Sequence, residues 1–206
     1  ALMIEKFATG SLASFGRETN VDLNNKYIVL DMTEMTENLK PLGMFMALDL
    51  VWDKAKESRI QKKVIFLDEL WQLIGASSNK LAAEFVLEVF KIIRGYGGSA
   101  ICATQDLNDF FSLDGGKYGK GIINNAKTKV ILNLEEDEAA RVQDILKLSE
   151  TELMNITHFE RGNGLISTNS NNVTVEFRAS EFETELITTD RAELQSILKR
   201  RRDMAQ

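Results

Sequence analysis

The chain has 206 residues, 44% of them apolar and 27% charged, a composition typical of a folded globular protein with a sizeable core. Its 25 Lys and Arg residues against 31 Asp and Glu residues give a net charge of −6, which argues against non-specific nucleic-acid binding by the whole surface. A single cysteine excludes an internal disulfide. Because the chain also has only one histidine, a structural zinc site is disfavoured.

The first residues, ALMIEKFATG, lack an initiator Met and read as the interior of a longer polypeptide. No apolar run reaches the roughly 18 residues that a membrane-spanning helix needs. We therefore interpret residues 1–206 as one partial domain of a larger protein.

Four short apolar runs predict strands, and three helical segments are predicted between or after them. The runs are rich in Val, Ile and Leu without strict alternation, which is typical of strands buried on both faces of a parallel sheet. The predicted strands are 26–32, 62–68, 99–105 and 128–134; the predicted helices are 40–58, 79–98 and 135–148. Strands that alternate with helices predict an α/β fold with right-handed crossovers.

The pattern changes in the C-terminal part, residues 160–206. Residues 163–177 predict two strands around an Asn-rich turn, and residues 190–206 predict a helix. The fold class expected for the whole chain is a mostly parallel sheet flanked by helices, followed by a β-hairpin and a helix.

Two acids stand at the end of the second predicted strand, in VIFLDELWQLI (residues 64–74). Ligands of open parallel sheets bind beyond the carboxyl ends of strands, where Asp68 and Glu69 fall. A hydrophobic strand followed by Asp-Glu has the form of a Walker B motif, in which the first acid helps to hold Mg²⁺ through its water shell. The second acid can polarise an attacking water as a general base.

The alternative interpretation is structural: Asp68 caps the following helix and Glu69 lies in its first turn. The nearby Trp71 can support such a loop, but its residue type favours simple packing of a large aromatic.

The third predicted strand also ends in polar residues, Thr104 and Gln105. In P-loop ATPases of the RecA type, a polar residue at this place lies near the γ-phosphate, where a neutral amide can bond phosphate or water. The alternative is that the two residues only form a turn. Two strands that both end in suitable polar groups favour the functional interpretation.

Two arginines are candidates for stabilising charge on a transferred phosphoryl group. Arg94 ends a predicted helix, a place that favours cations for structural reasons alone. Its functional interpretation is an arginine finger that acts on a nucleotide in its own subunit or in the next. Arg161, in ERGNG, has similar standing.

A phosphate-binding P-loop, G-x-x-x-x-G-K-[ST], is absent from these residues. The nearest segment, GGKYGKG at 115–121, has the wrong spacing, no preceding apolar strand, and Gly121 in place of the Ser or Thr. We interpret it as a flexible loop. Walker B thus occurs without Walker A. We expect either that the P-loop lies upstream of Ala1 or that the fold is degenerate.

Several segments together resemble one family. They are VIFLDELWQLI, KIIRGYGGSAICATQDLNDFF, INNAKTKVILNL and FERGNGLISTNSNNVTVEFRASEFETELITTD, in this order, with GSLASFGRETNVDLNNKYIVLDMTEM before them. They resemble the C-terminal ATPase domain of the conjugative-transfer ATPases of type IV secretion systems. This is the large ATPase that forms the fourth component of VirB-type machines, also called TraC- or TrbE-like.

The resemblance implies a RecA-like P-loop core that binds ATP and Mg²⁺. It implies that Asp68 and Glu69 are the Walker B acids, that Gln105 is the glutamine of the next motif, and that Arg94 is the arginine before the Gly-rich turn. Asp68 would hold the metal, and Glu69 and Gln105 would contact nucleotide or water. Because Walker A is missing, the piece alone is expected to be inactive.

The resemblance also implies an assembly and a place in the cell. The family associates with itself as a hexamer or a dimer-based ring, and its partners are other type IV secretion components. It sits at the cytoplasmic face of the bacterial inner membrane, where it powers pilus biogenesis or transfer of a DNA or protein substrate.

Two alternatives stay open. One is a DNA-pumping ATPase of the FtsK/HerA kind, which would bind DNA in a central channel and which the acidic balance disfavours. The other is a non-catalytic interaction module that keeps the ATPase fold for assembly.

Overall fold

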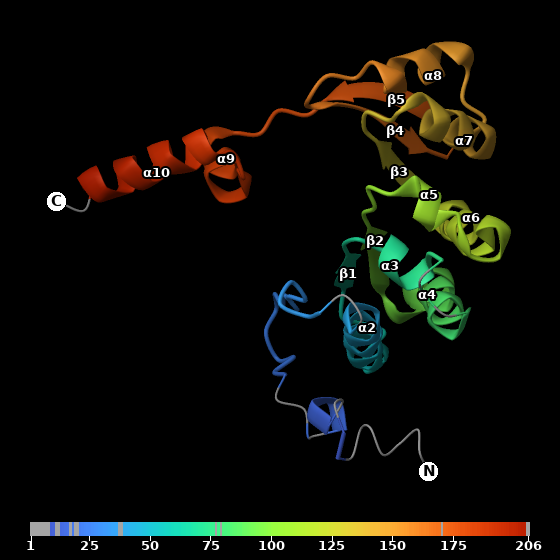
Figure 1. The fold of residues 1–206 in the computed structure, drawn as a ribbon, viewed down its shortest axis with the longest axis vertical. Helices are drawn as coiled ribbons and strands as arrows, with labels where there is room; N and C mark the ends of the chain where they lie inside the picture. Colours follow the sequence, from blue (N-terminus) through green and yellow to red (C-terminus); the bar gives the residue numbers. More distant parts are fainter. Residues whose placement is uncertain are drawn as a thin grey trace. The chain divides into compact units, whose positions relative to one another are not determined.

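The fold is described from a computed structural model of the chain (Figure 1). The structure describes residues 9–10, 13–16, 18, 21–36, 39–76, 78, 80–169 and 171–204. The opening residues 1–8, on which the interpretation as an interior segment depends, lie outside them, as do Asn79 and residues 205–206 at the ends of two predicted helices. The chain divides into two compact units, residues 1–104 and residues 105–206, and each is described by itself.

The first unit contains one parallel strand pair and the helices around it. Its elements in chain order are η1 (Ala13–Gly16), α2 (Lys40–Lys56), β1 (Lys63–Leu67), α3 (Trp71–Ile74), α4 (Lys80–Ile92), η2 (Ile93–Tyr96) and β2 (Gly98–Cys102). The predicted helices at 40–58 and 79–98 and the strands at 62–68 and 99–105 are confirmed, but the second helix ends already at Ile92 and is followed by η2, and the second strand ends at Cys102.

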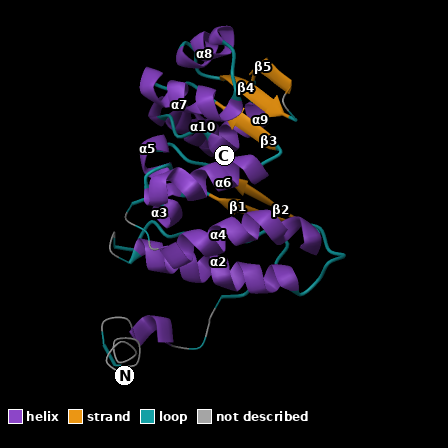
Figure 2. Ribbon diagram, turned by 90° about the vertical axis from the view of Figure 1, so that its right-hand side faces the viewer, coloured by secondary structure: helices purple, strands orange, loops and turns teal. Residues whose placement is uncertain are grey.

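Helix α2 begins with Pro41 in its first turn, where the missing N–H removes no helical hydrogen bond. Figure 2 shows α2 and α4 side by side, and the rings of Phe45 and Phe85 meet edge to face with their centroids 5.4 Å apart. The ammonium of Lys63, the first residue of β1, donates to the Ala55 carbonyl at the end of α2 (2.8 Å) and to the Tyr96 carbonyl of η2 (3.0 Å). This bond pattern ties the last turn of α2 to the start of β1.

Strands β1 and β2 run parallel and are joined by α3 and α4, which makes a β-α-β unit. Ile65 is buried, whereas Val64 and Phe66 on the opposite face are 63% and 61% exposed, and Ile101, paired with Phe66, is 47% exposed. The prediction that these strands are buried on both faces is therefore wrong for the described residues. Helices cover one face of the pair, and its other face is apolar and open.

The predicted strand at 26–32 is not a strand in the structure. Tyr27 is 86% exposed and Val29 is 69% exposed. A strand needs a partner for its backbone N–H and C=O groups, and this segment is paired with no strand in the described part of the chain. Its apolar composition favours a strand, but composition alone does not supply the partner.

The second unit contains an antiparallel sheet, with helices before it, between its first two strands and after it. Its elements are α5 (Leu107–Phe110), η3 (Leu113–Gly116), α6 (Lys117–Asn125), β3 (Thr128–Ile131), α7 (Glu136–Leu146), α8 (Glu150–Thr157), β4 (Asn163–Thr168), β5 (Asn171–Glu176), α9 (Glu181–Ile187) and α10 (Arg191–Met204). The predicted hairpin, the helix at 135–148 and the C-terminal helix are confirmed.

Strand β3 pairs antiparallel with β4, and β4 pairs antiparallel with β5. The run at 128–134 is thus a strand, but among the described residues parallel pairing is confined to β1 and β2. The α/β class is confirmed, and the hairpin supplies the neighbour of β3.

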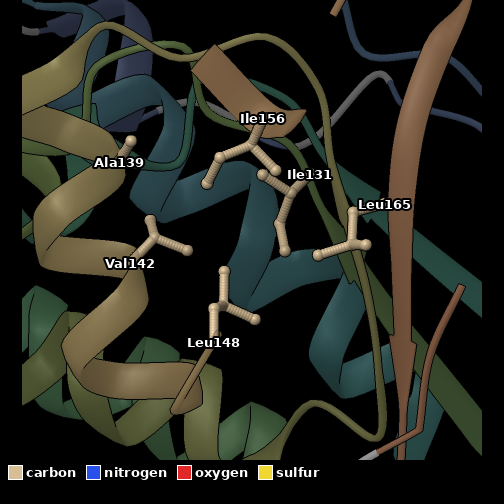
Figure 3. Close-up of a cluster of buried hydrophobic side chains, with 6 residues drawn as sticks. All are labelled: Ile131, Ala139, Val142, Leu148, Ile156 and Leu165. Atoms are coloured by element: carbon tan, nitrogen blue, oxygen red, sulfur yellow. The ribbon is translucent and has the colours of Figure 1, made fainter. Parts of the chain in front are cut away.

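The core of the second unit lies between this sheet and helices α7 and α8 (Figure 3). Its members are Ile131, Ala139, Val142, Leu148, Ile156 and Leu165. Ile131 and Leu165 are paired across β3 and β4, so their side chains project from the same face of the sheet toward these helices. No helix among the described residues is both long enough and apolar enough to cross a membrane.

Candidate functional site at the carboxyl end of β1

The prediction that β1 and β2 are neighbours is confirmed, and their carboxyl ends are joined by further hydrogen bonds. Leu67 is paired with Cys102 as the last residue pair of the ladder. Beyond it, the Ala103 N–H donates to the Leu67 carbonyl (2.9 Å) and the Leu70 N–H donates to the Ala103 carbonyl (3.2 Å). Asp68 and Glu69 therefore leave β1 directly beside the residues that leave β2, at the edge where parallel sheets bind ligands.

Glu69 has an unusual backbone conformation. Its φ is +52°, in the left-handed region that non-glycine residues seldom adopt, at a cost of about 1–2 kcal/mol. Its N–H donates to Oδ1 of Asp68 (3.0 Å), and its carbonyl accepts from the N–H of Gln72 (3.0 Å). The turn after β1 is thus held by hydrogen bonds on both sides of Glu69.

Trp71 contacts the second acid directly. Its indole Nε1–H donates to Oε2 of Glu69 over 2.5 Å, and the side chain is half-buried. The preference for simple packing at Trp71 missed this bond. The sequence carries no signal for this bond, because the contact depends on the positive φ of Glu69, which no glycine or asparagine indicates.

Asp68 is an exposed carboxylate whose Oδ1 accepts the Glu69 N–H. An exposed carboxylate at a strand end fits a Mg²⁺ ion held through water, because Mg²⁺ keeps several of its waters and uses one or two carboxylates. Within the described residues no group of three or more acids, histidines or cysteines is gathered as a metal site.

Residues after β2 continue the chain into the second unit. Thr104 is the last residue of the first unit, and Gln105 is exposed and opens the second. Asp106 caps α5 through its Oδ1, which accepts the N–H of Asp109 at 2.8 Å. Gln105 thus stands between the end of β2 and a capped helix.

Arg94 lies at the other end of the strand pair. It is an exposed residue of η2, which directly precedes β2, and Gly97 follows with a φ of +72°. A Cβ added to Gly97 would meet the Arg59 carbonyl oxygen at 2.7 Å, so this turn packs against the chain just before β1. The five residues of β1, each advancing about 3.3 Å, separate this end from Asp68 and Glu69.

Arg161 belongs to the second unit, where it is exposed in the turn before β4. Gly162 has a φ of +94°, and its carbonyl accepts the Phe177 N–H at 2.6 Å. The turn that carries Arg161 is therefore anchored to the end of the hairpin.

The Gly-rich segment 115–121 is not a flexible loop, so that prediction is wrong. It forms the end of η3 and the start of α6, with Tyr118 fully buried. Gly115 and Gly116 take positive φ at the turn into the helix, and a Cβ on Gly119 would meet the Phe110 carbonyl oxygen at 2.5 Å. The glycines serve this turn and this close packing.

With this geometry in view, comparison with known proteins identifies the family. The model of the TraG P-loop domain matches residues 14–193. The chain belongs to the TraG P-loop domain family. A search of curated proteins finds no significant match to this TraG P-loop domain.

One solved structure shares the fold of this TraG P-loop domain. VirB4 of Thermoanaerobacter pseudethanolicus matches with a TM-score of 0.80 at 24% sequence identity, over 89% of this chain and 50% of that chain. The genome packaging NTPase B204 from Sulfolobus turreted icosahedral virus 2, in complex with AMP, has a TM-score of 0.49 at 13% identity, over 71% of this chain and 65% of that chain. The same NTPase has also been solved in complex with ATP-gammaS.

Family and fold together confirm the resemblance to the type IV secretion ATPases and the P-loop ATPase fold class. The chain spans about half the length of the VirB4 chain that it matches.

Proposed function

We propose that this TraG P-loop domain belongs to an ATP-hydrolysing motor that energises substrate transfer or pilus biogenesis in a bacterial type IV secretion or conjugation system. The observation that carries the proposal is the position of Asp68 and Glu69. They follow a core strand at the ligand-binding edge of a parallel pair, in a family of P-loop domains.

In this proposal each residue at the strand ends has one task. Bound Mg²⁺ would neutralise charge on the phosphates of ATP, and Asp68 would hold its water shell. Glu69 would accept a proton from the attacking water, and Gln105 would hydrogen-bond the γ-phosphate or that water. The phosphate-binding backbone and lysine would come from another part of the complete polypeptide.

Arg94 is proposed to act on the nucleotide of a neighbouring subunit. What supports this is its position in η2, a full strand length away from Glu69 of its own chain. Arg161 stays a second candidate for the same task, because it is exposed in an anchored turn. An arginine supplied in this way stabilises charge that develops in the transition state.

The decisive experiment measures ATP binding and hydrolysis by the complete polypeptide with Glu69→Gln. We expect nucleotide binding to persist while kcat falls about a hundredfold or more, because a general base contributes that much. Glu88→Gln is the matched control, since Glu88 is an exposed acid on α4. Wild-type hydrolysis in Glu69→Gln would show that Glu69 is not the general base. No nucleotide binding or hydrolysis by the parent protein would instead support the non-catalytic module.

The proposal extends to assembly and location. We propose a hexamer or a dimer-based ring, peripheral at the cytoplasmic face of the inner membrane, that works with other type IV secretion components on a DNA or protein substrate. Light scattering with and without ATP tests the assembly, and release from membranes by alkaline carbonate tests the location. Hydrolysis strongly stimulated by DNA would favour the FtsK/HerA alternative, which the net charge of −6 disfavours.

A further inference from the structure

We infer that Trp71 is a positioning residue: its indole N–H holds the carboxylate of Glu69 in the orientation from which that carboxylate acts. The inference rests on the proposed function, because Glu69 must act on water for its orientation to affect the rate. The contact itself can be tested without any activity.

The backbone of Glu69 is already fixed before its side chain is considered. Its φ of +52° is maintained by the bond from its own N–H to Asp68 and by the bond from Gln72 to its carbonyl. The next residue, Leu70, is fully buried and donates its N–H to the Ala103 carbonyl at the end of β2. The Cα–Cβ direction of Glu69 is therefore set by β1 and β2 together.

The glutamate side chain still has three rotatable bonds, and a carboxylate that must meet one water molecule needs these restrained. The indole of Trp71 supplies the restraint, since its N–H lies 2.5 Å from Oε2. Indole is a donor only, so this bond selects a carboxylate oxygen without a proton. With a single N–H, Trp71 directly engages one of the two oxygens.

The donor is itself well anchored. Trp71 begins the short helix α3, in which Leu73 and Ile74 are fully buried, and its carbonyl accepts the Gly75 N–H at 2.6 Å. Buried residues on both sides thus fix the backbone that carries the indole. A phenylalanine here would keep most of the aromatic packing and lose only the donor.

The first test is the indole N–H resonance in a nitrogen-15 correlation spectrum of the 206-residue chain. Trp52 and Trp71 are its two tryptophans, so two such signals are expected. Trp52 is a built-in control, because it is buried in α2 against the ring of Tyr96. We expect Glu69→Gln to move the Trp71 signal upfield and to leave the Trp52 signal in place. An unmoved Trp71 signal overturns the inference.

The second test is kinetic, in the complete polypeptide. We expect Trp71→Phe to lower kcat about tenfold or more with the KM for ATP nearly unchanged, because misplacing a catalytic group affects the transition state more than substrate binding. Trp52→Phe is the matched control: it loses an indole in the core and should keep kcat. An unchanged or increased kcat in Trp71→Phe overturns the inference.

The two failures are distinguishable. If Glu69→Gln abolishes hydrolysis and Trp71→Phe leaves kcat unchanged, the positioning role fails and the proposed function stands. If the parent protein hydrolyses no ATP while the Trp71 resonance still responds to Glu69→Gln, the contact stands and the proposed function fails, and the positioning role fails with it.

Discussion

At the scale of single residues, left-handed backbone marks Glu69 as different from its counterparts. Four non-glycine residues among those described have positive φ: Glu69, Asp114, Lys147 and Asn169. Lys147 ends α7 and Asn169 lies in the β4–β5 turn, places where this conformation is ordinary. Glu69 instead follows a parallel strand. A strained backbone conformation of this kind persists only where the surrounding structure holds it in place, which is often at functional sites.

Cys102 illustrates how burial alone sets chemistry at one residue. Burial raises the pKa of its thiol to about 11, and it ends β2 on the covered face of the parallel pair. We expect alkylation of the folded chain by iodoacetamide to stay slow through neutral pH, because the thiolate is the nucleophile. The rate should rise only as the pH approaches 11, whereas the unfolded chain should react near pH 9.

The same raised pKa has a consequence for stability. The folded state binds the thiol proton more tightly than the unfolded state, so the contribution of Cys102 is complete below about pH 9 and is lost as the pH rises toward 11. Cys102→Ala should remove this alkaline loss. Fast alkylation of the native protein at pH 8 would contradict the burial of the thiol.

At the scale of elements, two helices begin with the same capping box but differ in what they bury. Ser149 and Glu152 cap α8, which carries the fully buried Ile156, whereas Ser180 and Glu183 cap α9, which has no buried residue. In each box the serine accepts the N–H of the glutamate, and the glutamate accepts from the serine. The two boxes therefore form a matched pair.

We expect Ser149→Ala to lower the free energy of unfolding of the second unit by about 1 kcal/mol, the usual cost of a lost N-cap. Ser180→Ala should leave that free energy unchanged and only increase amide hydrogen exchange within α9. Urea titration with exchange detected by mass spectrometry measures both. Equal losses of stability would mean that α9 is part of the cooperative core.

This effect should depend on pH. The hydrogen bonds from Ser149 lower the pKa of Glu152 below its ordinary value of 4.5. A carboxylate with a lowered pKa stabilises the fold above its unfolded pKa, and that contribution is lost as the pH falls. The difference between wild type and Ser149→Ala should therefore shrink below about pH 4.5, and a constant difference would argue against the box.

Most elements could be predicted from local patterns. Helix α2 with its early Pro41, and the hairpin with its Asn-rich turn, each carry their own signal in neighbouring residues. Pairing could not be read in this way. β3 is a short run with Lys, Val and Ile like β1, yet it pairs antiparallel with β4, because its partner is set by residues far along the chain. The segment 26–32 fails as a strand for the same reason.

The candidate site, like the fold, could be predicted only in part. Asp68 and Glu69 were found because a strand end and two acids are adjacent in sequence, and the neighbouring strand was inferred from the α/β pattern. The left-handed φ of Glu69 could not be predicted, since no glycine or asparagine at this position indicates it. Arg94 directly precedes β2, so the parallel pairing of β1 and β2 places it at the amino end of the pair, a strand length from Glu69.

At the scale of the whole molecule, each unit has a sheet with one covered face and one open apolar face. In the first unit the open face carries Val64, Phe66 and Ile101. In the second, Val130 and Val173 lie on either side of Ile166 in one cross-strand row and are 54% and 56% exposed. In each unit the helices cover only the other face of the sheet. Apolar side chains on the uncovered face therefore stay exposed in both units.

This asymmetry predicts opposite outcomes for two adjacent residues of β1. Ile65→Thr should cost about 2 kcal/mol or more of unfolding free energy, because Ile65 is 6% exposed and a hydroxyl would enter the core. Phe66→Thr should change that free energy little, because the ring already contacts water and threonine suits a strand. Denaturant titration of the 206-residue chain measures both.

Phe66→Thr should instead change the surface. Large exposed apolar patches bind hydrophobic dyes, so the parent chain should bind anilinonaphthalene sulfonate and Phe66→Thr should reduce its fluorescence. Tyr27→Thr is the control, because Tyr27 is 86% exposed and lies on no sheet. If both variants lower the fluorescence equally, the dye reports scattered aromatics. If Phe66→Thr unfolds the chain, the face of β1 that carries Phe66 is covered in solution.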